Sequence, residues 1–283
     1  MRKSHGAPVL EIAADQPLIP ARPRRPEPAL TLGVEEEFLL LHADTGRAMP
    51  VVDEVVAALP GEVRGHSRLE FRACQLEMAS PVATDLTALR EQLRYLRRTA
   101  AAASRTAGAR LVAVGATPLP DGRSPLSHEP RYAEMARRFG AVAAEPAVCG
   151  CHVHVGLPNR ELAVQVSNHL RTYLPTVQAL TANSPLHDGR DTGYASWRTI
   201  QFSHWPSAGP APYFDSARDY DETVEQLTAA GVMMDEGMVY WYARLSATYN
   251  HLTLPVLDSR AQRPSTTGRN GLGAGPPRPH SSG

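Results

Sequence analysis

The sequence predicts an α+β domain, in which a β-sheet packs helices on one face and presents polar side chains on the other. Residues 31–41, TLGVEEEFLLL, and 146–158, PAVCGCHVHVGLP, both alternate with the period of two that is typical of half-buried strands. Between them, leucines recur every three or four residues from position 86 to position 96, which is the spacing of an amphipathic helix. Strand and helix patterns therefore share one chain.

The composition excludes several classes of partner. With 283 residues, the chain is long enough for one large domain or two small ones. Lys plus Arg and Asp plus Glu both number 29, so no excess positive charge would attract nucleic acid or an anionic membrane surface. The chain has no run of 18 apolar residues and no signal-peptide pattern, which favours the cytoplasm, and its three cysteines indicate thiols.

The strand in residues 31–41 is the strongest single signal. Its period places Glu35 and Glu37 side by side on one face, opposite Val34 and Phe38. Glu36 points into the apolar face, where it needs an arginine partner. An acidic, solvated sheet face is the simpler alternative to a cation site for the other two carboxylates.

A helix and a second strand follow. Residues 51–59 predict a short amphipathic helix that ends at Pro60. The strand in LEFRACQLEMASP, residues 69–81, has Gln75 and Glu77 on its polar face.

The next part of the chain predicts helix, strand and helix. The longest helix covers residues 85–106 and is capped by Thr84 or Asp85. A short apolar strand lies in residues 109–118, and a second helix covers residues 131–143.

The following strand, in residues 146–158, places His152 and His154 on one face. A helix then runs from Asn159 to Leu180 and is broken at Pro175. Residues 182–214 are aromatic, rich in Gly and Pro, and too long for an ordinary connection, so we expect them to shape a site.

The last predicted elements are a helix and two strands. The helix starts with Asp219 as N-cap and closes at Gly231. Residues 238–246 predict a strand, and residues 252–258 predict a weak one because Pro255 cannot donate to a sheet.

The chain is expected to have three parts. Residues 1–30 and 259–283 are low in periodic apolar residues and rich in Pro, so we expect a disordered leader and a disordered tail. The folded and catalytic domain covers residues 31–258.

Polar side chains on three predicted strands suggest a cation site. They are Glu35 and Glu37, Gln75 and Glu77 with Glu70 near the strand start, and His152 with His154. If these strands are neighbours, the clustered carboxylates need a divalent cation to relieve their repulsion. Mostly carboxylate ligands suit Mg²⁺ or Mn²⁺, whereas more His or Cys would favour zinc.

Each signal also has a simpler interpretation. A histidine pair in a strand is more often structural than metal-binding. Tyr194, Trp197 and Trp205 could cover the edge of the core, and Arg190 and Arg198 could clamp an anionic substrate or form surface ion pairs. No phosphate-binding loop or dinucleotide fingerprint occurs.

Four motifs together resemble one family. They are GVEEEF at residues 33–38, QLEMASP at 75–81, CGCHVHVGLPNRE at 149–161, and ANSPLHDGRDTGYASWR at 182–198 followed by WPSAGP at 205–210. In this order, from about Thr31 to Ser246, they are similar to the carboxylate-amine ligase family, also called glutamate–cysteine ligase type 2.

The resemblance implies a fold and a reaction. The fold is glutamine-synthetase-like, an antiparallel sheet that is backed by helices and forms a half-funnel holding Mg²⁺ and ATP. In the reaction, ATP phosphorylates the γ-carboxylate of glutamate, and the amine of cysteine, or another amine, attacks the acyl phosphate. ADP and phosphate are released.

The resemblance also implies roles for particular residues. The metal ligands would be Glu35, Glu37, Glu77 and His152, with Glu70. Contacts to the nucleotide would come from His152, His154 and Arg198, and the catalytic contacts to phosphate or substrate carboxylate from Arg198 and Arg244.

The chain departs from the family pattern near its end. Tyr242 stands where the pattern has an acid, and Thr253 and Pro255 stand where it has a Glu and an Arg. The resemblance therefore implies a C-terminally truncated domain.

Two functions follow: a weak ATP-dependent ligase that makes a γ-glutamyl amide, or an inactive homologue that at most binds Mg²⁺-ATP. A metal-dependent amide hydrolase is a distant third. The sequence leaves open the acceptor amine and whether the chain forms a homo-oligomer.

Overall fold

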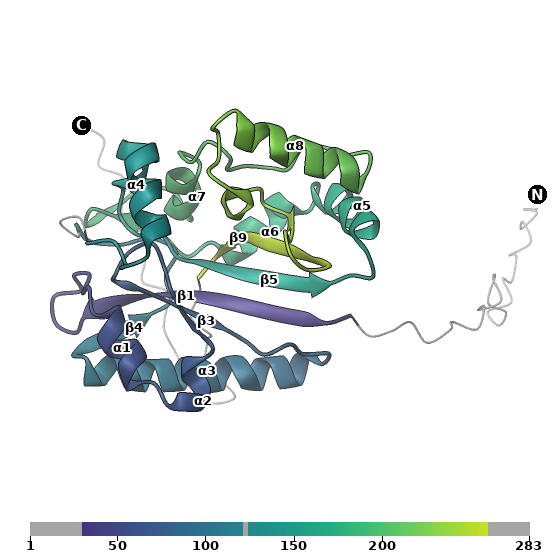
Figure 1. The fold of residues 1–283 in the computed structure, drawn as a ribbon. Helices are drawn as coiled ribbons and strands as arrows, with labels where there is room; N and C mark the ends of the chain where they lie inside the picture. Colours follow the sequence, from purple (N-terminus) through teal and green to yellow (C-terminus); the bar gives the residue numbers. More distant parts are fainter. Residues whose placement is uncertain (1–29, 121–123, 260–283) are drawn as a thin grey trace, which may run out of the picture.

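An antiparallel sheet organises the computed structural model, which describes residues 30–120 and 124–259. Within these residues the sheet has seven strands. Six of them follow the order β2-β3-β1-β5-β9-β8, and β4 pairs with the C-terminal end of β1, beyond the part of β1 that pairs with β5. Figure 1 shows the sheet crossing the middle of the molecule between two groups of helices. The predicted leader and tail, residues 1–30 and 259–283, lie almost wholly outside the described residues.

The strands of the main sheet are β1 (Leu32–His42), β2 (Ser67–Leu69), β3 (Gln75–Ala79), β4 (Ala109–Val112), β5 (Gly150–Gly156), β8 (Arg244–Leu245) and β9 (His251–Asp258). The strands β6 (Leu186–His187) and β7 (Arg190–Asp191) form a separate hairpin. The helices are α1 (Val52–Ala58), α2 (Gly61–Arg64), α3 (Leu86–Thr106), α4 (Pro130–Ala143), α5 (Arg160–Leu170), α6 (Leu174–Thr181), α7 (Trp197–Phe202) and α8 (Ala217–Ala229), with one 3₁₀ turn, η1 (Glu236–Met238).

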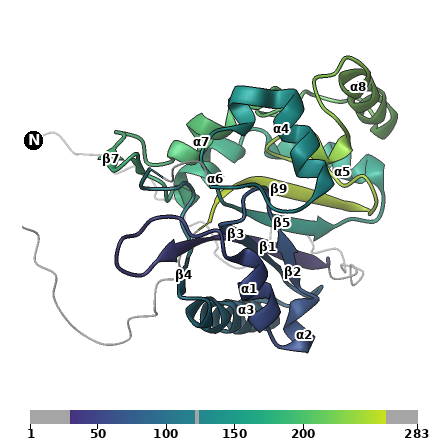
Figure 2. The ribbon, with the colours of Figure 1, turned by 60° about the vertical axis from the view of Figure 1, so that its left-hand side comes forward.

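Two apolar cores support the sheet from its two ends. In the first, Phe38 of β1 and Leu76 of β3 pack against α1, α2 and α3. In the second, α5, α6 and α8 pack against β8, β9 and Trp241. Figure 2 shows α1, α2 and α3 together on one side of β1 and β3. Each half of the sheet therefore has its own helical support.

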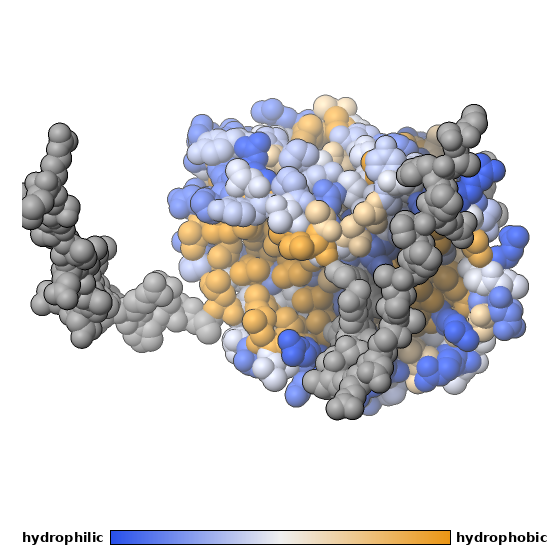
Figure 3. Space-filling model, turned by 180° about the vertical axis from the view of Figure 1, so that it is seen from behind, coloured by the Kyte–Doolittle hydropathy of each residue, from blue (hydrophilic) through white to orange (hydrophobic). Residues whose placement is uncertain are grey.

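Apolar residues also gather on the back of the molecule, where Figure 3 shows them across the middle of the face, between polar margins. On the surface shared by β1, β5 and the start of α3, Leu32, Leu93, Cys151 and Val153 are only partly buried. The period of two then leaves the polar residues of β1 and β5 on the opposite face.

The carboxylate of Glu36 has the arginine partner that the sequence requires. Arg97 of α3 donates from Nε to Glu36 Oε2 at 2.6 Å, and its Nη2 bonds the other carboxylate oxygen. The guanidinium also lies over the ring of Phe38, 5.5 Å from its centroid. The prediction for Glu36 is confirmed, and the pair ties α3 to the centre of the sheet.

The N-cap of the last helix was predicted wrongly. Ser216, not Asp219, caps α8, with its hydroxyl accepting from Asp219 N at 3.1 Å. Asp219 lies in the first turn and accepts from Asp215 N, also at 3.1 Å. Ser216 has extended backbone angles that Asp219 lacks, so the helix begins one turn earlier than its acidic residues suggest. The α3 helix, by contrast, is capped by Asp85.

Other helix and strand boundaries differ from the predicted ones, because residues near them make hydrogen bonds outside the predicted element. Pro175 lies in the first turn of α6, where a missing N–H costs nothing, so the chain breaks before this residue. The predicted strand over 238–246 shrinks to β8, since the amide of Tyr242 bonds Gly209 O outside the sheet. Residues 182–214 contain a hairpin and the helix α7, neither of which shows in their composition.

Pro255 does not break the last strand. β9 continues from His251 to Asp258, and its pairing with β5 shifts register between Cys151 and Val153, opposite Pro255. A bulge of this kind leaves a residue out of the ladder, so the missing N–H of proline costs no sheet hydrogen bond. Among the described residues, no helix is both long and apolar enough to cross a membrane.

We expect Arg97→Met to lower the free energy of unfolding by about 3 kcal/mol, because it leaves the Glu36 carboxylate buried without its cation. Replacing both residues with leucine should recover most of that loss. Urea denaturation monitored by circular dichroism measures both effects. Arg98→Met, at an exposed neighbouring position on α3, is the matched control. If Arg97→Met lowers the free energy of unfolding no more than Arg98→Met does, the structural role of the pair is contradicted.

Candidate active site

A cavity of about 290 Å³ lies on the polar face of the sheet. Its floor comes from β1, β3 and β5, and its other walls from α4, α7 and the segment from η1 to β8. Seven of the eight residues that the sequence nominates line it: Glu35, Glu37, Glu70, Glu77, His152, Arg198 and Arg244. His154 lies beside the cavity and not in its lining.

Strand register brings these side chains together. β1 pairs with β3 so that Glu37 lies opposite Glu77, and with β5 so that Glu35 lies opposite His152. Because cross-strand partners point to the same face, four functional groups from three strands meet in one place. The predicted neighbourhood of the three strands is confirmed.

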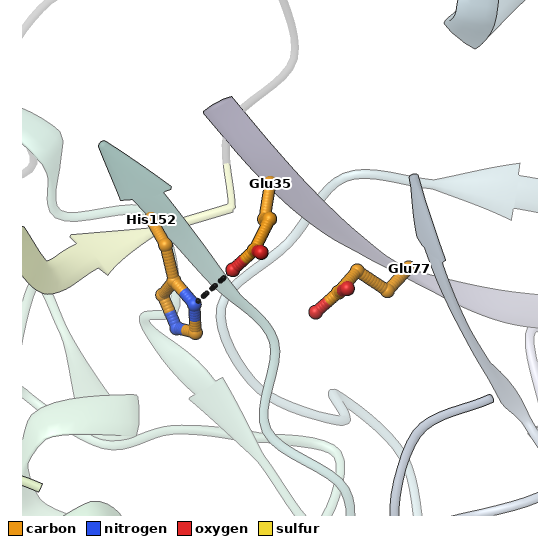
Figure 4. A group of neighbouring side chains, drawn as sticks. All are labelled: Glu35, Glu77 and His152. Atoms are coloured by element: carbon orange, nitrogen blue, oxygen red, sulfur yellow. Dashed lines mark hydrogen bonds and ion pairs between the residues drawn. The ribbon is translucent and has the colours of Figure 1, made fainter. Parts of the chain in front are cut away.

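Two imidazoles hold the Glu35 carboxylate. His152 Nδ1 lies 3.1 Å and His154 Nε2 lies 3.0 Å from Glu35 Oε2. Figure 4 shows the His152 ring and the Glu35 carboxylate pointing toward each other, with Glu77 facing them from β3. Burial raises the pKa of Glu35, but the close contacts with His152 and His154 outweigh this effect, and the pKa ends well below its usual range.

The remaining carboxylates repel one another. Burial, together with the charge of Glu37, raises the pKa of Glu70 to about 8. Burial and the neighbouring charge of Glu70 also raise the pKa of Glu77 well above its usual value. Glu37 is held by the amide of Gly150, which donates to its Oε2 at 2.7 Å.

Two sets of ligand atoms are close enough to share a cation. One oxygen or nitrogen from each of Glu35, Glu77 and His152 lies within 4.8 Å of the others, and so does one oxygen from each of Glu37, Glu70 and Glu77. Glu77 belongs to both sets. Oxygen-rich sets with one imidazole match the preference of a hard divalent ion.

The cavity also has a cationic side. Arg198 is 4% exposed, donates from Nη2 to Pro255 O at 3.1 Å and lies over the ring of Phe202. Arg244 donates to Val239 O at 3.0 Å, and burial lowers its pKa. Within the described residues neither guanidinium forms an ion pair, so both keep donors for an anionic ligand.

His154 and the end of the sheet form a small polar group of their own. His154 Nδ1 lies 3.0 Å from Thr253 Oγ1 and 3.2 Å from His251 Nε2. Thr253 is opposite His154 in the register of β5 and β9, so it lies on the same face as the carboxylates. His251 carried no signal in the sequence, because a lone histidine at the start of a weak strand is unremarkable in composition.

The aromatic segment contributes only part of what was expected. Trp205 lines the cavity with Tyr132 and Tyr240. Trp197 instead stacks on His187, with ring centroids 5.3 Å apart, and does not line the cavity. Gln201 and Arg131 also line the cavity, and sequence reasoning missed both. The helix α7 was not predicted, and no local pattern places the predicted helix over residues 131–143 against the polar face of the sheet.

Comparison with known proteins agrees with this geometry. The sequence profile of the family described as "Glutamate-cysteine ligase family 2" matches residues 31–256. A relative in Salinispora arenicola with the provisional name glutamate–cysteine ligase 2 is 62% identical over 230 residues, covering 81% of this chain and 61% of the relative. A relative in Mycolicibacterium vanbaalenii, provisionally named glutamate–cysteine ligase 2-2, is 49% identical over 228 residues, covering 81% of this chain and 62% of the relative. The chain thus spans about three fifths of the length of these relatives.

Solved structures share the fold at low sequence identity. A bifunctional glutathione synthetase from Pasteurella multocida has a TM-score of 0.62 at 17% identity, over 81% of this chain and 35% of its own. A glutamate–cysteine ligase from Francisella tularensis, solved in complex with AMP, has the same TM-score at 11% identity, over 81% of this chain and 61% of its own. The predicted fold, a glutamine-synthetase-like antiparallel sheet backed by helices, is confirmed, and the chain belongs to the glutamate–cysteine ligase family 2.

Proposed function

We propose that this chain carries the catalytic face of an ATP-dependent carboxylate–amine ligase. Its acid substrate would be glutamate, its acceptor cysteine or another amine, and its product a γ-glutamyl amide with ADP and phosphate. The observation that carries the proposal is the convergence of carboxylates, an imidazole and two arginines without ion-pair partners among the described residues on one cavity. The family and the AMP complex of a protein with the same fold support it.

The donor set fits a divalent cation. Burial, with repulsion from the neighbouring carboxylates, raises the pKa values of Glu70 and Glu77, and a bound cation would offset both effects. Glu35, Glu37, Glu70, Glu77 and His152 would hold Mg²⁺ or Mn²⁺. When bound, such ions neutralise the charge of a triphosphate.

The residues of the chain would act by binding and orientation. Arg198 and Arg244 would hold the phosphoryl group or the substrate carboxylate with charge-assisted hydrogen bonds. An oxygen of the γ-carboxylate attacks the γ-phosphorus of ATP, and the bond from phosphorus to the ADP oxygen breaks. The amine nitrogen then attacks the acyl carbon, and phosphate leaves. No protein nucleophile is required, because the substrate carboxylate itself accepts the phosphoryl group.

A second candidate is a protein that binds Mg²⁺-ATP without turnover. It is favoured by β9, where Thr253 contacts His154 on the carboxylate face and Pro255 offers only its carbonyl to Arg198. The resemblance implies a Glu and an Arg at these two positions. Losing one charge-stabilising group of this kind typically costs about 10²–10³ in rate.

We expect Mg²⁺-ATP to bind the protein saturably, and Glu77→Gln to weaken binding by at least about 10-fold because Glu77 belongs to both ligand sets. Calorimetric titration measures the affinity, and Glu91→Gln, at an exposed position on α3, is the control. Phosphate release that requires both glutamate and an amine would identify the ligase. Binding without release would favour the second candidate, and the absence of binding by folded protein would contradict both.

We expect the metal-free protein to lose stability as the pH rises from about 4.5 to about 8. In this range Glu70 stays protonated in the folded state while the unfolded chain has released that proton, so the free energy of unfolding falls, by at most about 1.4 kcal/mol per pH unit for each such proton. Glu35 has a lowered pKa, so its contribution is lost only below about pH 4.5.

Urea denaturation in EDTA at several pH values measures this dependence. Glu70→Gln should flatten the curve, and Mg²⁺ should raise stability more at pH 8 than at pH 5. A free energy of unfolding that rises between about pH 4.5 and pH 8 would contradict the raised pKa of Glu70.

A further inference from the structure

Gln201 has a buried side-chain amide in which only the nitrogen makes a hydrogen bond. It lies on α7, is 5% exposed and lines the cavity. Its Nε2 donates to Pro146 O at 2.6 Å, whereas its Oε1 has no hydrogen-bond partner among the described residues. A buried acceptor without a donor is unfavourable, so a ligand that supplies a donor would be favoured.

The orientation of this amide is determined by its neighbour. Pro146 O can only accept, so the nitrogen of Gln201 must face it, and the oxygen points away from it, enclosed by the residues around the cavity. The other glutamine in the lining, Gln75, differs, because its Oε1 accepts from Arg72 N and its Nε2 donates to Val148 O. Gln75 is therefore structural, and Gln201 keeps an acceptor for a ligand.

The surroundings of Gln201 favour a positively charged donor. The carboxylate of Glu145, which lines the same cavity, bonds His204, whose amide in turn donates to the main-chain carbonyl of Gln201. Tyr240 also lines the cavity, whereas the ring of Phe202 is already covered by the guanidinium of Arg198. Carboxylates and aromatic faces both attract an ammonium group.

Arg198, one turn earlier on α7, has the opposite polarity. Its Nε is a buried donor that lacks an acceptor among the described residues. The same helix thus offers a donor for an anionic oxygen and, three residues later, an acceptor for a nitrogen. A ligand with a carboxylate or phosphoryl oxygen near one amine would meet both.

We propose that Gln201 Oε1 is the acceptor of an amine subsite in this cavity, and that it determines the preference for substrates with an ammonium or amine nitrogen. The inference rests on the proposed function for the source of that nitrogen. The source is either the α-ammonium of glutamate or the acceptor amine, and both would donate N–H to the same oxygen.

The experiment compares ligands that differ in one group. Glutamate and glutarate share both carboxylates, but glutarate lacks the α-ammonium. Each is titrated calorimetrically into protein saturated with Mg²⁺ and a non-hydrolysable ATP analogue, and cysteine and methylamine are titrated in the same way. Binding does not need turnover, so failure of the ligase reaction would leave this test intact.

If the subsite binds the α-ammonium, Gln201→Met should lower the affinity for glutamate by about 10- to 100-fold and leave the affinity for glutarate unchanged. If it binds the acceptor amine, the variant should lower the affinity for cysteine and methylamine and leave the affinities for glutamate and glutarate unchanged. Arg198→Met should weaken glutamate and glutarate alike.

Gln178→Met is the matched control, because Gln178 on α6 bonds Thr199 of α7 but does not line the cavity. It should leave all affinities unchanged. The proposal is overturned if wild-type protein does not distinguish glutamate from glutarate and binds no amine. It is also overturned if Gln201→Met changes the affinity for ligands with and without nitrogen by the same factor.

Discussion

The register of β1 against its two neighbours is the constraint on which the site depends. Glu37 faces Glu77 across one ladder, and Glu35 faces His152 across the other. A shift of one residue in either ladder would carry the carboxylates to the helical face, where only Glu36 has a cation. The buried pair of Glu36 with Arg97 opposes that shift, because it would be broken at the same time.

Crowded carboxylates and uncommitted arginines would be unfavourable in a site with no ligand. Glu70 and Glu77 reduce their repulsion by holding protons, and Glu35 is stabilised by two imidazoles. Arg198, Arg244 and Gln201 retain donors or acceptors inside the cavity. Both features point to ligands that bring positive metal ions together with anionic and amine groups, as a phosphoryl-activated amide synthesis does.

Several elements could be predicted because local physics decides them. The long helix starts at Asp85, whose carboxylate accepts from Ala88 N, and its leucines form one apolar face. Others could not. Pro255 lies in a full strand because its backbone follows the pairing with β5, far away in the chain. The cap of α8 is different, since the bond from Asp219 N to Ser216 is local, and the Ser–x–x–Asp spacing that signals it was overlooked.

The sequence by itself determined which residues share a face, because the strand period depends only on backbone geometry. It thereby determined that Glu35, Glu37, Glu77 and His152 point away from the strand face that carries Phe38 and Leu76. Only the tertiary structure decided that they meet in one cavity, that α7 turns Arg198 and Gln201 toward them, and that Trp197 packs elsewhere. Those outcomes depend on strand order and loop packing between residues far apart in the chain, which no local pattern encodes.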